Sequence, residues 1–218
     1  LLQVYYRWFC YHKYNESHLV LIKDKTLFKE MLSFSFWDVV GAFTVNGNYQ
    51  GVNLLINKFF GVLYNASYGI TRQINGILDQ FVGNFMTAVN PQITKDFANG
   101  EIDKMKRLVY MSSKLGFILY CFIGIPFFVE ADYILYIWLG HVPDKTSLFL
   151  RLTVIICLIR AFSRPVITAV HASGNIKQLN VFSGGQSVAL IIPLTYIFYK
   201  TGMPVESSFF VLILCSII

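Results

Sequence analysis

Residues 108–129, which read LVYMSSKLGFILYCFIGIPFFV, decide the fold class of this chain. The stretch holds a single charged residue, Lys114, and it is long enough to cross a bilayer core about 30 Å thick, which takes about 20 mostly apolar residues of helix. From Phe117 to Val129 it shows no alternation, whereas a strand of a membrane barrel would alternate apolar and polar side chains. The stretch therefore predicts a membrane-spanning helix.

Similar stretches lie on both sides of it, at residues 31–57, 63–90, 148–170 and 179–199. Residues 1–9 are typical of the end of an earlier span, and residues 208–218 are typical of the truncated start of a later one. Because the chain begins without Met and stops inside an apolar run, we expect it to be a fragment of a longer protein. We predict an all-α polytopic membrane protein with five full spans and two partial ones.

The composition supports a membrane protein and argues against a soluble globule. Hydrophobic residues make up 55% of the chain and charged residues 14%, against about a quarter charged in ordinary soluble domains. The excess of 18 Lys and Arg over 12 Asp and Glu gives a net charge of +6. On a chain of this hydropathy, the excess favours the anionic headgroups of a lipid bilayer over nucleic acid as a partner.

The orientation follows from the Lys and Arg residues of the short loops, which stay on the cytoplasmic side. Alternate loops differ sharply, with nine basic residues in one set and three in the other. The first set is Lys13, Lys23, Lys25, Lys29, Lys95, Lys104, Lys106, Arg107 and Lys177, and the second is Lys58, Lys145 and Lys200. We expect the loops near Lys25, Lys104 and Lys177 to be cytoplasmic.

Polar residues recur at helical spacing inside two of the predicted spans. In residues 63–90 the spacing is 3, 4, 3 and 4, over Asn65, Tyr68, Arg72, Asn75 and Asp79. In residues 31–57 it is 4, 3 and 4, over Asn46, Gln50, Asn53 and Asn57, with Asp38 nearer the start. Such spacing places each set on one face of a helix, and that face must meet protein or water.

Two arginines, Arg160 and Arg164, lie one turn apart near the middle of the span at 148–170. Like charges at this spacing repel each other, so the pair requires an anion, either a carboxylate from another helix or a ligand phosphate. The deep groups, Arg72, Arg160 and Arg164 against Asp38 and Asp79, sum to +1 and predict a mildly cationic cavity. Purely structural pairing of these arginines with the aspartates is the alternative.

Other polar features carry less functional information. Gly184 and Gly185 lie in an apolar span, where they are expected to let a neighbouring helix approach closely. The four cysteines are scattered singly, so we expect no metal site and no cofactor. A membrane-embedded glycan-processing enzyme that acts from the external loop by acid–base catalysis is an alternative function, and its candidate residues are Glu130, Asp132, His141 and Asp144.

Several short motifs resemble the polysaccharide flippases of the multidrug, oligosaccharidyl-lipid and polysaccharide exporter superfamily. They are NKFFG at 57–61, NASYGI at 65–70, NPQITK at 90–95, IWLGHVP at 137–143 and TAVHASGN at 168–175. The similarity is one of order and spacing, and it covers roughly residues 30–199.

The resemblance implies the following organisation. Family members have 12 or 14 helices in two MATE-like six-helix lobes, with the substrate path between the lobes. Residues 1–9 would end the last helix of the first lobe, residues 10–30 would be the basic cytoplasmic loop between lobes, and residues 31–218 would be the incomplete second lobe. The missing first lobe of the same chain would then be a partner.

The resemblance also implies a function, without enzymatic activity. Such proteins flip undecaprenyl-pyrophosphate-linked oligosaccharide across the bacterial inner membrane by alternating access, for cell-surface polysaccharides such as the O-antigen of lipopolysaccharide. A drug or cation antiporter of the same superfamily is the other alternative.

The family has no fixed motif at the polar positions, so the roles of single residues are our own inference. We expect Arg72, Arg160 and Arg164 to contact the pyrophosphate, because guanidinium groups bind phosphate well. The amide groups expected to contact sugar are those of Asn46, Gln50, Asn53 and Asn75. Asp38 and Asp79 would couple transport to H⁺ or Na⁺, or would balance the arginines.

Overall fold

The computed structural model describes residues 2–14 and 24–217. Helices account for most of these residues, and the described part of the chain contains no strand. The prediction of an all-α protein is therefore confirmed.

The chain divides into two units, residues 1–33 and 34–218. The first unit contains α1 (Leu2–Lys13) and the beginning of α2 (Lys25–Phe60). Asp24 caps α2, because its carboxylate accepts a hydrogen bond of 2.8 Å from the backbone N–H of Thr26. Residues 15–23, the middle of the predicted basic loop, lie outside the described residues.

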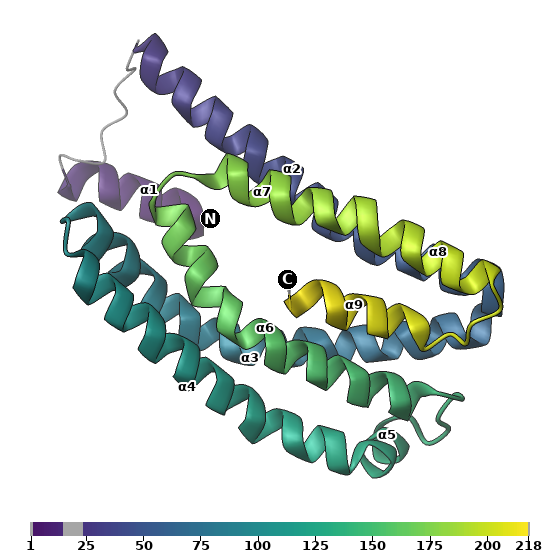
Figure 1. Ribbon diagram of the computed structural model, residues 1–218. Helices are drawn as coiled ribbons and strands as arrows, with labels where there is room; N and C mark the ends of the chain where they lie inside the picture. Colours follow the sequence, from purple (N-terminus) through teal and green to yellow (C-terminus); the bar gives the residue numbers. More distant parts are fainter. Residues whose placement is uncertain (1, 15–23, 218) are drawn as a thin grey trace. The chain divides into compact units, whose positions relative to one another are not determined.

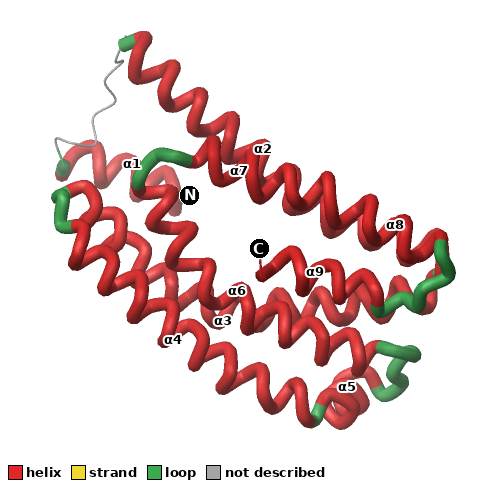
Figure 2. The backbone as a smooth tube through the Cα atoms, in the orientation of Figure 1, coloured by secondary structure: helices red, strands yellow, loops and turns green. Residues whose placement is uncertain are grey.

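The second unit contains the rest of α2 and a series of helices joined by short turns (Figure 1). The helices are α3 (Val62–Ala98), α4 (Ile102–Val129), α5 (Ala131–Leu139), α6 (Thr146–Ala172), α7 (Ile176–Gln186), a π-helical turn (Ser187–Ile191), α8 (Ile192–Lys200) and α9 (Ser207–Ile217). Figure 2 shows how little of the unit is loop. A helix covers each predicted span, and the short helix α5 was not predicted.

Three helical stretches of the described chain are both long and apolar enough to cross a membrane, which indicates a membrane protein. They are Ile102–Val129, Thr146–Ala172 and Ile176–Lys200. The third stretch is not a regular α-helix throughout, because the π-helical turn comes just before Pro193, which lacks the N–H that a continuous helix would need.

The core of the second unit lies between α3, α4 and α6. Ile74, Leu78 and Val82 line one face of α3, and they pack with Tyr120 of α4 and Leu150 of α6 in one cluster of buried residues. These residues of α3 recur every four positions, which is the spacing of a single helix face. The polar residues Asn75 and Asp79 each directly follow one of these core residues. The packing of the core therefore fixes where the polar side chains point.

Close approach at glycine brings α2 against α7. A Cβ atom on Gly184 would lie 3.1 Å from Oγ1 of Thr44, whereas one on Gly185 would meet nothing within 4 Å. A Cβ atom on Gly41 of α2 would lie closer still, 2.6 Å from Cγ of Asn180, whose amide donates a hydrogen bond of 2.7 Å to the Trp37 carbonyl. The expected close approach is therefore confirmed for Gly184, while Gly185 faces open space.

The difference in surroundings between Gly184 and Gly185 predicts that substitutions at these two positions differ in their effect on stability. Gly184→Leu should lower the stability of the protein by about 1–3 kcal/mol, because the new side chain collides with Thr44 and forces α2 and α7 apart. Gly185→Leu should leave stability nearly unchanged. Thermal unfolding of the purified protein in detergent measures both, and an equal loss in the two variants would contradict the helix contact.

An ion pair joins the turn before α6 to the turn before α9. Nζ of Lys145 lies 2.8 Å from the carboxylate of Glu206. Burial raises the pKa of Glu206, but the hydrogen bond from Lys145, a backbone hydrogen bond at Glu206 and the charge of Lys145 together outweigh burial and hold this pKa below its ordinary value of 4.5. The same hydrogen bond raises the pKa of Lys145. The pair is therefore charged throughout the neutral range.

The lowered pKa of Glu206 predicts a pH-dependent contribution to stability. The contribution is present above pH 4.5 and is lost as the pH falls through the lower pKa of the folded state. Lys145→Gln should lower the unfolding temperature by a few degrees at pH 7, and the difference from the parent should shrink under acid. The control is Lys200→Gln, which removes an exposed charge for which the structure shows no ion pair.

Candidate functional site

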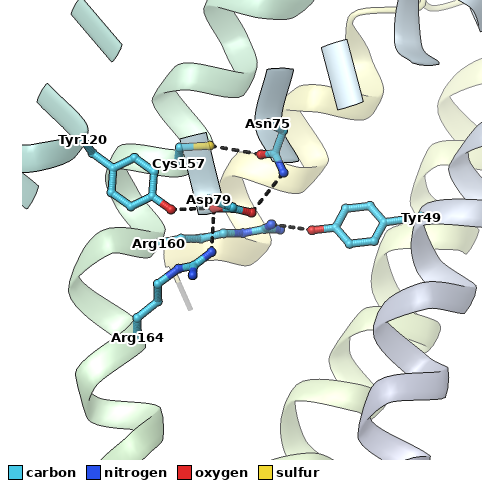
Figure 3. A network of polar contacts seen from close by, with 7 residues as sticks. All are labelled: Tyr49, Asn75, Asp79, Tyr120, Cys157, Arg160 and Arg164. Carbon is cyan, nitrogen blue, oxygen red and sulfur yellow. Dashed lines mark hydrogen bonds and ion pairs between the residues drawn. The ribbon is translucent and has the colours of Figure 1, made fainter. Parts of the chain in front are cut away.

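Helix α3 presents three of the predicted polar residues to one region of the second unit. Arg72, Asn75 and Asp79 follow one another by 3 and 4 residues, so they lie on one face of the helix. Figure 3 shows Asn75 and Asp79 pointing toward the α6 side chains Arg160 and Arg164. The structure thus brings together all three predicted arginines, with Asn75 and Asp79.

The carboxylate of Asp79 accepts hydrogen bonds from three side chains. Nη2 of Arg164 and the hydroxyl of Tyr120 each lie 2.5 Å from Oδ1, and the amide of Asn75 donates to Oδ2 over 3.1 Å. These donors come from α6, α4 and α3, respectively. The carbonyl of Asn75 accepts in turn from the thiol of Cys157 over 3.0 Å. Asp79 therefore ties the three helices together and neutralises Arg164.

Arg160 and Arg72 share a neutral partner, Tyr49 of α2. Nη1 of Arg160 donates to the Tyr49 hydroxyl over 2.6 Å. The guanidinium of Arg72 lies over the same ring, 3.5 Å from its centroid. A cation–π contact and a bond to a phenol hold a guanidinium in place without cancelling its charge.

The site therefore has more positive than negative charge. Arg72, Arg160 and Arg164 contribute +3 and Asp79 contributes −1, so the formal sum is +2. Within the described residues, Asp79 is the only carboxylate that forms an ion pair with any of these arginines. The excess leaves Arg72 and Arg160 available to a ligand anion.

A cleft of about 520 Å³ lies beside these groups, between α2, α6, α7 and α9. Its polar lining includes Tyr49, Arg160, Arg164 and Ser163. Apolar side chains such as Phe182 and Ile191 line the remainder. A much smaller cavity of about 20 Å³, the size of one water molecule, reaches Arg72 and Asn75. The cleft is large enough for a charged group with attached polar atoms.

The other residues predicted for the site all belong to α2, and none of them lines the cleft. Asn46 is exposed, and its amide donates to the carbonyl of Ala42 within its own helix. Gln50 and Asp38 are exposed and Asn53 is half-buried, and none of them lines the cleft. The face of α2 toward the cleft instead carries Asn48 and Tyr49.

The sequence-based reasoning missed Tyr49, Tyr120 and Cys157. All three lie in the predicted spans, where a tyrosine or cysteine is an ordinary packing residue. A usable signal exists for Cys157, which precedes Arg160 by three residues and thus shares its face of α6. For Tyr49 the helical spacing of the neighbouring Asn and Gln residues predicted that a different face of α2 would meet the site.

Of the four candidate residues of an external-loop enzyme, Asp132 forms an ion pair in the structure. The carboxylate of Asp132 pairs with Arg151 at 2.8 Å. A hydrogen bond from Ser147 lowers the pKa of Asp132, burial opposes this, and Arg151 lowers the pKa further. A carboxyl group with a lowered pKa is a poor general acid. The described residues contain no group of three His, Cys, Asp or Glu side chains that could hold a metal ion.

Comparison with protein-family models, with curated proteins and with solved structures gave no match.

The contact between Asp79 and Arg164 predicts a measurable coupling. Asp79→Asn and Arg164→Gln should each destabilise the protein, because each leaves a partly buried charged group without its partner. The double variant should lose less than the sum, with a coupling energy of about 0.5–3 kcal/mol. Thermal unfolding of the four proteins measures the cycle. Asp38→Asn is the matched control, and its combination with Arg164→Gln should be additive.

Proposed function

We propose that this chain is part of a transporter that flips an undecaprenyl-pyrophosphate-linked oligosaccharide across the bacterial inner membrane. The observation that carries the proposal is Arg160, which lines a cleft of about 520 Å³ and rests on the neutral Tyr49, a residue that it shares with Arg72. A pyrophosphate offers several anionic oxygens to such a pair, and guanidinium groups bind them through charge-assisted hydrogen bonds.

Exposed amide side chains on α2 and α3 support a polar path along the unit. On α3 the exposed side chains include Gln73, Gln80 and Asn84, and on α2 they include Asn46 and Gln50. Exposed amides are costly against lipid but stable against water, sugar or another protein. We infer that these amides face the other lobe of the whole protein and line the path of the oligosaccharide.

A drug or cation antiporter is the weaker alternative. A cavity that binds organic cations needs an excess of carboxylates, whereas this site has three arginines and one aspartate. Asp79 already accepts three hydrogen bonds, one of them from Arg164. We assign it the role of a counter-ion that orients Arg164, and Asp38 stays the candidate for coupling to H⁺ or Na⁺.

The proposal predicts that Arg160→Ala abolishes glycan export while the protein still inserts into the membrane. Losing one charge-assisted contact costs about 1.5–3 kcal/mol, so affinity for a polyprenyl pyrophosphate should fall by about ten- to a hundredfold. The measurements are surface glycan in a flippase-deficient bacterial strain that carries the full-length protein, and equilibrium binding of the lipid to that protein in detergent.

Arg151→Ala is the matched control, because this arginine lies on the same helix and is already paired with Asp132. It should retain export and binding. Normal export and binding by a correctly inserted Arg160→Ala variant would refute the proposed role of the arginines.

A further inference from the structure

A second cavity of about 560 Å³ lies on another side of the unit, between α4 and α6. Val109 of α4 and Val166, Ala169 and Val170 of α6 form much of its lining. Small and branched side chains at these positions leave a depression between the two helices. We call this cavity the α4–α6 groove.

The two ends of the α4–α6 groove differ in chemistry. One end carries Lys106 of α4 and Ser173, which directly follows α6. At the other end lie Ser113, whose hydroxyl donates to the carbonyl of Phe162, and the ring of Phe162, which stacks on that of Phe117 with centroids 4.7 Å apart. The groove extends along α4 from Lys106 to Ser113, which is about 10 Å of helix. An amphiphilic ligand requires a groove of this form, with a charged end and a mostly apolar remainder.

The basic residues near the polar end differ in whether they form an ion pair. Lys104 is paired with Glu101 at 2.8 Å and lies 3.7 Å from Asp96. Lys106 and Arg107 are exposed, and in the described part of the chain neither forms an ion pair. The groove therefore ends beside two positive charges that are not neutralised within the unit.

We propose that the α4–α6 groove binds an anionic phospholipid, with one acyl chain in the groove and the phosphate at Lys106. Charge complementarity selects the anionic headgroup, because a basic residue at the membrane surface attracts such lipids. The apolar lining selects a hydrocarbon chain. The positive-inside rule places the Lys106 end at the cytoplasmic leaflet. This site is separate from the arginine cleft and does not depend on the transported substrate.

The test is native mass spectrometry of the full-length protein in a neutral detergent, titrated with phosphatidylglycerol and, separately, with phosphatidylcholine. We expect one phosphatidylglycerol to be retained in preference to phosphatidylcholine. Lys106→Gln should weaken phosphatidylglycerol binding about fivefold, the effect of one basic residue at a membrane surface. Ala169→Trp should remove the retained lipid by filling the groove.

The matched control is Lys104→Gln, which removes the same charge two residues away but outside the groove, and it should bind phosphatidylglycerol like the parent. Because Lys106 is exposed, its substitution leaves the fold intact even if Ala169→Trp misfolds. Equal retention of the two lipids, or unchanged affinity in Lys106→Gln, would overturn the proposal. Stoichiometric displacement of phosphatidylglycerol by undecaprenyl phosphate would also overturn it, since the groove would then belong to the isoprenoid chain.

Discussion

The arrangement of α3, α4 and α6 depends on one carboxylate, that of Asp79. A charge among apolar helices is stable only when its partners surround it, and Asp79 receives hydrogen bonds from Asn75, Tyr120 and Arg164. Each bond fixes a side chain of a different helix, so the carboxylate sets how the three helices face one another. The apolar contacts of α3 with α4 and α6 supply the burial, and Asp79 supplies the orientation.

Helix α2 contacts α3 and α6 at the site through a neutral side chain, that of Tyr49. Tyr49 holds Arg160 through a phenol oxygen and Arg72 through the face of its ring, and both contacts leave the guanidinium charge in place. A phosphate that binds these two arginines competes directly with Tyr49. On the proposed function, the presence of the substrate and the position of α2 are therefore linked through the same two side chains, which is what alternating access requires of a binding site.

The sequence predicted the α3 side of the site better than the α2 side, and the reason is physical. On α3 the polar residues lie on the face next to that of the core residues Ile74 and Leu78, so the spacing of Arg72, Asn75 and Asp79 was enough to bring them together. On α2 the polar spacing marks an exposed face, and the buried face is set by close contact at Gly41 with Asn180 of α7. Such a contact depends on a partner far along the chain, and no local pattern reveals it. The helix α5 was missed because nine residues are too few for a span.

The faces of the unit differ in what can cover them. Exposed residues of α4 include Leu115, Ile118 and Phe122, which are stable against lipid. Exposed residues of α3 include Gln80 and Asn84, which require water or protein. Lipid alone is a poor environment for a unit that exposes such amides as well as apolar side chains. The amides are stable against another part of the protein or a hydrated path. The uncompensated arginines lie in the same unit, so on the proposed function the charge of the site and the exposed amides both favour an anionic, hydrated substrate.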